Sequence, residues 1–100
     1  MVVLTTTDSE EAAKALAALI VAERLAACVQ TTPIRSVYRW QGAVRHESEV
    51  LLVIKTRVAL LDRLEAFVKT HHTYDTPEIV ALPIVGGSQE YLDWIAAETT

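Results

Sequence analysis

The alternation of apolar and polar residues over positions 34–56 predicts a long β-hairpin. A period of two over residues 34–40, in a run rich in β-branched and aromatic types, is typical of a strand. The side chains expected to share one face of this strand are Ile34, Ser36, Tyr38 and Trp40. Gly42 can take the positive φ of a tight turn. The return strand, residues 49–54, has five consecutive apolar residues, so both of its faces are expected to be buried.

The length of this hairpin predicts an oligomer. A return strand from His46 to Thr56 would span about 35 Å at about 3.3 Å per residue, whereas the radius of gyration of a compact domain of this size is about 13 Å. A protruding ribbon that carries Tyr38 and Trp40, beside a strand apolar on both faces, needs a second cover. The simplest cover is another copy of the chain, so we expect an obligate homo-oligomer.

The remaining pattern predicts an alternation of strands and helices. The first helix is expected to begin at one of two capping-box pairs, Thr7/Glu10 or Asp8/Glu11. Pro33 is expected to break the strand that leads into the hairpin, because proline within a strand marks an edge, a bulge or a bend. In chain order the expected elements are strand 2–6, a helix ending near residues 24–25, strand 27–40, the return strand, helix 57–70, strand 78–85 and helix 89–98 after a Ser88 cap.

This order is strand, helix, strand, strand, helix, strand, with one helix added at the end. It predicts an α+β, ferredoxin-like βαββαβ fold whose antiparallel sheet carries helices on one face only. We expect a single domain over residues 1–100, since 51% of the residues are hydrophobic and one core can form.

The net charge and the cysteine content limit the classes of partner and the cellular compartment that we expect. The formal net charge of −4 argues against a nucleic-acid or anionic-membrane partner, either of which would need a basic patch. A single cysteine, Cys28, cannot form an internal disulfide, which favours a reducing compartment. No run approaches the roughly 18 apolar residues of a membrane span. We therefore expect a cytoplasmic protein.

Two activities hosted by ferredoxin-like sheets are disfavoured by missing residues. An acylphosphatase would need a phosphate-cradling loop with an arginine after the first strand, and residues 5–8 contain neither glycine nor arginine. An RNA-recognition domain would need aromatic residues on its third strand, and residues 50–54 contain none. No enzymatic constellation stands out.

The residues that could bind a ligand fall into two groups. His71 and His72 lie in a polar segment near Asp75 and Glu78, and imidazole is a ligand for Cu, Zn and Ni; alternatively, the two histidines cap the preceding helix. Lys55 ends an otherwise apolar strand, so it must be paired or lie in a cleft. Tyr38, Trp40 and Tyr74 could line that cleft, or they could pack between subunits. Cys28, among alanines and a valine, is expected to be a small core residue.

The chain resembles the CutA divalent-cation tolerance proteins over nearly its whole length. The motifs that carry the resemblance are RLAAC at 24–28, SVYRWQG at 36–42, EVLLVIKT at 49–56, HTYDTPEI at 72–79 and YLDW at 91–94. The resemblance implies a cytoplasmic ferredoxin-like homotrimer with hairpins interlocked between subunits, linked to copper tolerance and binding Cu(II), without a firmly implied catalytic activity. It also implies an architecture similar to the PII signal-transduction trimers, which bind small effectors in inter-subunit clefts.

Carried onto this sequence, the resemblance implies a metal site at His71 and His72. Thr5 stands where some members have a cysteine ligand, and Thr73 stands where the family usually has proline, which loosens the loop that presents His72. The leading hypothesis is a non-enzymatic trimer that binds divalent copper. One alternative is a PII-like effector sensor whose inter-subunit cleft is lined by Tyr38, Trp40, Lys55, Tyr74 and Glu78. Another is a structural trimer that anchors a partner protein.

Overall fold

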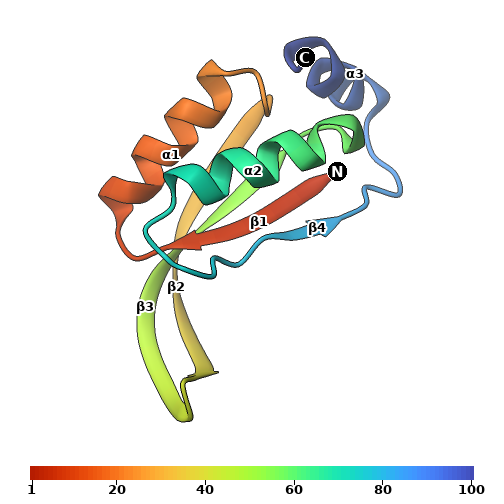
Figure 1. Cartoon of the computed structure of the whole chain (residues 1–100). Helices are drawn as coiled ribbons and strands as arrows, with labels where there is room; N and C mark the ends of the chain where they lie inside the picture. Colours follow the sequence, from red (N-terminus) through yellow and green to blue (C-terminus); the bar gives the residue numbers. More distant parts are fainter.

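A computed structural model describes all 100 residues and shows one four-stranded antiparallel sheet in the order β2-β3-β1-β4, with helices α1 and α2 across one face (Figure 1). The predicted α+β, ferredoxin-like fold with a terminal helix is confirmed. The bounds in chain order are β1 Val2–Thr7, α1 Glu10–Ala22, β2 Cys28–Trp40, β3 Ala43–Lys55, the 3₁₀ turn η1 Val58–Leu60, α2 Leu61–His71, β4 Val80–Leu82 and α3 Gln89–Glu98.

The β2–β3 hairpin extends well beyond the rest of the molecule, as predicted (Figure 1). The two strands pair without interruption from Cys28↔Lys55 to Trp40↔Ala43, and the longest dimension of the chain is 44 Å. Both turn residues have positive φ, 51° at Gln41 and 78° at Gly42. Positive φ at both central residues gives a turn whose twist matches that of the flanking strands.

The predicted break of β2 at Pro33 is wrong. Pro33 pairs with Val50 inside a continuous strand. The reason is that β2 lies at the edge of the sheet, where every second residue turns its backbone N–H away from the neighbouring strand. A proline at such a position removes no hydrogen bond from the ladder.

Two other predicted boundaries also need correction. The predicted strand 78–85 is reduced to Val80–Leu82, because β4 pairs with β1 only opposite Val2–Leu4 and lies between two prolines, Pro77 and Pro83. Neither predicted capping box starts α1. Its N-cap is Ser9, whose Oγ accepts a hydrogen bond from the Ala12 amide at 3.1 Å, because β1 continues through Thr7 and delays the helix.

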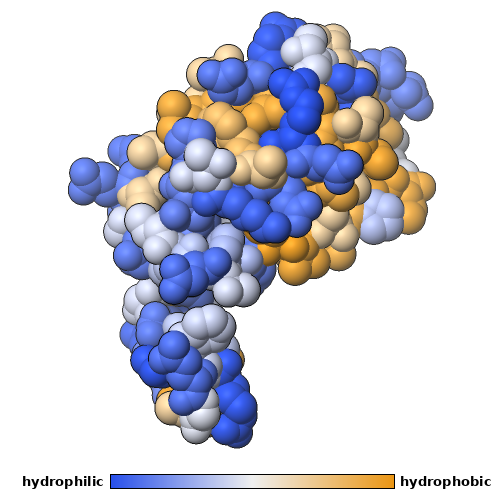
Figure 2. Space-filling model, viewed as in Figure 1, coloured by the Kyte–Doolittle hydropathy of each residue, from blue (hydrophilic) through white to orange (hydrophobic).

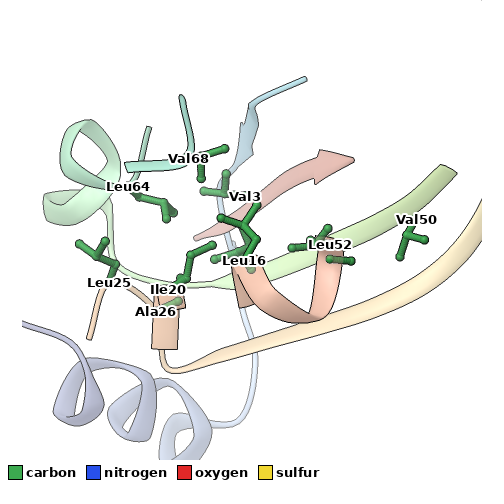
Figure 3. Packing of buried hydrophobic residues seen from close by; sticks show 11 residues of the cluster. Val3, Leu16, Ile20, Leu25, Ala26, Val50, Leu52, Leu64 and Val68 are labelled. Atoms are coloured by element: carbon green, nitrogen blue, oxygen red, sulfur yellow. The ribbon is translucent and has the colours of Figure 1, made fainter. Parts of the chain in front are cut away.

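The hydrophobic core lies between the sheet and the two covering helices. Leu52 and Ile54 of β3, Ile20 of α1 and Leu64 of α2 are completely buried, and Figure 3 shows their neighbours from the sheet and both helices meeting in one cluster. Apolar residues at helical spacing on α1 and α2 meet alternate residues of the strands.

The opposite face of the sheet has no helix over it. Leu51 and Val53 of β3 are half-buried there, and Val80 and Leu82 of β4 are each 45% exposed. Figure 2 shows apolar surface around β4, whereas the protruding hairpin is largely hydrophilic. In a single chain, therefore, only the helix-covered face of β3 is fully buried, and its other face is not.

Thr5 supplies a test of the core. Its side chain is 0% exposed, and its Oγ1 has no hydrogen-bond partner. Thr5→Val replaces this hydroxyl by a methyl group of similar size, so we expect it to raise the free energy of unfolding by about 1 kcal/mol. The matched control is Thr56→Val, because Thr56 is 1% exposed but donates to the Leu25 carbonyl at 2.6 Å. Urea denaturation should give opposite signs for the two variants, and a loss of stability in both would contradict the assignment.

Candidate functional site

A cleft of about 750 Å³ lies between the outer part of the hairpin, from Glu49 out to Trp40, and the segment 73–78 that follows α2. Three aromatic side chains line it, Tyr38, Trp40 and Tyr74, together with four carboxylates and no lysine or arginine. The carboxylates are those of Glu47, Glu49, Asp75 and Glu78. The cleft is therefore both aromatic and acidic.

Strand register places the hairpin side of this cleft. Ser36 pairs with Glu47 and Ile34 with Glu49, so these four residues share the face that also carries Tyr38. This face is the one without helices, since Val50 and Leu52 point the other way into the core. Glu47 and Glu49 thus lie beside the aromatic residues of the neighbouring strand.

Tyr74 and Glu49 close the inner end of the cleft. The Tyr74 hydroxyl donates a hydrogen bond to Glu49 Oε2 at 3.0 Å, and only 9% of the Glu49 residue is exposed. Burial raises the pKa of Tyr74, and so do the hydrogen bond to Glu49 and the charges of Glu49, Asp8 and Glu47. The pKa of Tyr38 is also raised, first by desolvation and then by Glu47. For both tyrosines desolvation is the main cause, and neighbouring carboxylates add to it.

These shifts predict a loss of stability in alkaline solution. Above the ordinary tyrosine pKa of 10.0 the unfolded chain releases the Tyr74 proton, while the folded chain keeps it because its pKa is raised. The unfolded state then binds fewer protons, so the free energy of unfolding falls as pH increases. The contribution of Tyr74 is complete below pH 10 and disappears as pH passes the folded pKa. Denaturation at several alkaline pH values should show a shallower decline in Tyr74→Phe, but no such change in Tyr91→Phe, which alters a tyrosine on α3.

His72 joins the cleft loop to the sheet through both ring nitrogens. Nδ1 accepts a hydrogen bond from the Tyr74 amide at 3.0 Å, so the proton of the neutral ring is on Nε2, which donates to the Thr6 carbonyl at 2.6 Å. The rings of His72 and Tyr74 are 4.8 Å apart. Neither nitrogen of His72 is free to bind a metal ion in this arrangement.

His71 differs from its neighbour. Its Nδ1 lies 2.9 Å from the Phe67 carbonyl and must donate, because a carbonyl oxygen only accepts. This leaves Nε2 of an exposed ring with a lone pair and no partner. The bond to Phe67 is the helix-capping role considered from the sequence. His71 therefore caps α2 and still offers one metal-binding nitrogen.

Comparison with known proteins decides the family. A family model described as CutA1 divalent ion tolerance protein matches residues 1–98. The chain belongs to the CutA1 family. It is 50% identical to the divalent-cation tolerance protein CutA of Thermus thermophilus over 98% of this chain and 96% of that protein, and 51% identical to the chloroplastic protein CutA 1 of Oryza sativa over 99% of this chain. It spans about half the length of such plant relatives, 56% for the rice protein.

Solved CutA1 structures have the same fold. The Thermus thermophilus protein superposes with a TM-score of 0.96 at 50% identity, covering 99% of this chain and 97% of that one. The Oryza sativa CutA1 structure also gives a TM-score of 0.96, at 51% identity, with 99% and 92% covered. A CutA structure from Archaeoglobus fulgidus is described as periplasmic. None of the three α-helices here is long and apolar enough to cross a membrane.

The structure of this CutA1 family member brings together only some of the residues singled out from the sequence. Tyr38, Trp40, Tyr74 and Glu78 share the cleft. Within the same chain Lys55 lies six residues beyond Glu49 along β3, about 20 Å away. Its Nζ donates to Gln30 Oε1 at 2.7 Å and lies 5.9 Å from the Tyr91 ring centroid. A place for Lys55 in a cleft between subunits stays a prediction.

Two carboxylates of the CutA1 cleft, Glu47 and Glu49, were not predicted. Their spacing of two, just before the apolar run of β3, was the available signal, because it places both on one face of a strand. The histidine pair lies beside the cleft rather than within its lining. No group of three or more His, Cys, Asp or Glu side chains is arranged to hold a metal ion.

Proposed function

We propose that this CutA1 family member is a non-enzymatic homotrimer that binds a divalent cation, Cu(II) in particular, through His71 and His72. The observation that carries the proposal is the unpartnered Nε2 of the exposed His71 ring, since imidazole nitrogen is a preferred ligand of copper. Thr5 adds no soft ligand, because its hydroxyl oxygen is a hard donor, and its side chain is buried on the helix side of β1. His72 can join the ion only by releasing the Tyr74 amide or the Thr6 carbonyl, so further ligands must come from water or neighbouring subunits.

Copper titration by calorimetry tests this proposal. His71→Ala should weaken Cu(II) binding by at least about tenfold, because it removes a direct ligand of the ion. Removing a residue that only hydrogen-bonds to a ligand already lowers metal affinity by about 10–100-fold. His46→Ala is the matched control, because it removes the other exposed histidine, on the hairpin. Equal binding by the parent and His71→Ala, or an equal loss in His46→Ala, would exclude the assigned site.

The homotrimer is supported by the strand edges and the apolar surface that one chain leaves exposed. Both outer strands, β2 and β4, have free backbone edges, which pair readily with other chains. The helix-free sheet face carries half-buried and exposed apolar residues, and patches of this kind mark protein–protein contacts. Three interlocked copies would cover the strand edges and the apolar part of this face, around β4 and the inner half of β3. The single half-buried thiol, Cys28, further supports a cytoplasmic location.

A second candidate function, effector sensing in the manner of PII trimers, is favoured by the cleft. Its volume of about 750 Å³ suits a small organic molecule, since such sites measure about 300–1,000 Å³. A ligand that binds only the folded protein must raise its melting temperature. A panel of metabolites that leaves the melting temperature unchanged would remove this candidate.

A further inference from the structure

Glu49 is a buried charge without a cationic partner. Its residue is 9% exposed, and the one side-chain ion pair of the chain, Lys69–Glu65, lies on α2 away from the cleft. Tyr74 donates one hydrogen bond to Oε2, but a hydroxyl group carries no compensating charge. Buried carboxylates are normally paired because desolvation is costly. A cation from outside the chain would meet this requirement.

The rest of the cleft favours the same kind of ligand. Glu47, Asp75 and Glu78 add three carboxylates, and no lysine or arginine is among the lining residues. The nearest basic side chain on this face, Arg45 opposite Tyr38, forms no ion pair, so one positive charge stands against four carboxylates. In the single chain Trp40 and Tyr38 are 41% and 38% exposed, and both line the cleft. Aromatic faces attract organic cations, and quaternary ammonium groups are bound by aromatic cages. Desolvation is the main cause of the raised pKa values of Tyr38 and Tyr74, and the neighbouring carboxylates Glu47 and Glu49 raise them further.

Other ligand classes fit less well. A phosphate-bearing effector needs basic side chains, and the cleft offers four carboxylates instead. An inorganic divalent ion needs several oxygen ligands around one point, and no three carboxylate or histidine side chains converge in this way. The cleft is also much larger than a single ion requires. An organic molecule with a positive charge satisfies both the charge and the volume.

We propose that the cleft binds an organic ammonium ion, with Glu49 and Glu47 balancing the charge and Tyr38 and Trp40 contacting the alkyl groups. This inference rests on the second candidate function and names the class of its effector. It does not require a metal, because neither histidine lines the cleft.

Choline and its uncharged isostere 3,3-dimethyl-1-butanol provide the test, because they differ in charge but hardly in shape. Calorimetric titration of the assembled protein in the presence of EDTA should give saturable choline binding and at least about tenfold weaker binding of the isostere. Glu47→Gln and Glu78→Gln should each weaken choline binding several-fold. Glu90→Gln, an exposed acid on α3, should leave it unchanged.

Several results would overturn the proposal. They are equal binding of choline and the isostere, unchanged choline binding in both glutamine variants, and absence of choline binding. Absence of choline binding together with loss of assembly in Glu47→Gln would show that a second copy of the chain fills the cleft. If ATP raises the melting temperature while choline does not, the cleft remains an effector site and only the ammonium class fails. The metal site is decided separately by the copper titration.

Discussion

Shortening the β2–β3 hairpin by four residue pairs is expected to turn the assembly into monomers that keep their fold. Deleting residues 36–39 and 44–47 removes complete pairs from the ladder, from Ser36↔Glu47 to Arg39↔Val44. Because an even number of residues is removed from each strand, the side chains next to the turn still point to the same faces of the hairpin. The deletion removes about 13 Å of ribbon at about 3.3 Å per residue. None of the deleted residues belongs to the core cluster, so the single-chain fold should survive.

Sedimentation at micromolar concentration measures the result. The parent should have about three times the chain mass of 11.0 kDa, and the shortened chain should have the mass of one chain with native far-UV circular dichroism. Val58→Ala, at a residue 70% exposed outside the hairpin, should remain trimeric and serves as the control. A parent that sediments as a folded monomer would contradict the expectation of an obligate oligomer. A shortened chain that stays trimeric would show that the sheet face alone suffices for assembly.

Hydrophobic periodicity predicted which segments form the hairpin and the helices, but it did not predict where strands and helices begin and end. The hairpin follows from alternation in residues 34–40, a glycine turn and an apolar return strand. The break predicted at Pro33 does not occur because the effect of a proline depends on whether its strand is an edge strand, which is a property of the whole sheet. The boundaries of β4 and α1 were missed for a similar reason. β4 is only as long as its pairing with β1, and α1 begins after Ser9 because β1 continues through Thr7.

The candidate site depends more on tertiary structure than the fold does. Aromatic spacing on β2 indicated Tyr38 and Trp40, whereas the position of Lys55 relative to them depends on which end of β3 borders the cleft and on how subunits assemble. Glu49 becomes informative only when its burial and its contact with Tyr74 are known. The role of His72 depends on a carbonyl of β1, 66 residues away in sequence. Local sequence patterns do not contain such contacts.

His72→Ala is expected to lower the free energy of unfolding by about 2 kcal/mol, because two hydrogen bonds are lost and their partners are left partly buried. The partners are the Tyr74 amide and the Thr6 carbonyl. The first bond holds Tyr74 to the His72 ring and the second holds that ring to β1, so together they fix the segment 73–78 against the sheet, and the wall of the cleft should loosen as well. Urea denaturation measures the loss of stability, and hydrogen exchange at the Tyr74 amide measures the loosening.

Two further variants separate this role from a general effect of removing an imidazole. In His72→Asn the side-chain Oδ1 stands as many bonds from Cα as Nδ1 and can still accept from the Tyr74 amide, so we expect an intermediate loss and retained amide protection. His71→Ala removes only the local bond to Phe67 and should cost less than about 1 kcal/mol. Equal losses in the two alanine variants would refute the structural role of His72. If that role holds, a copper ion bound at His72 Nδ1 must displace the Tyr74 amide, so added copper should speed exchange of this proton in the parent protein.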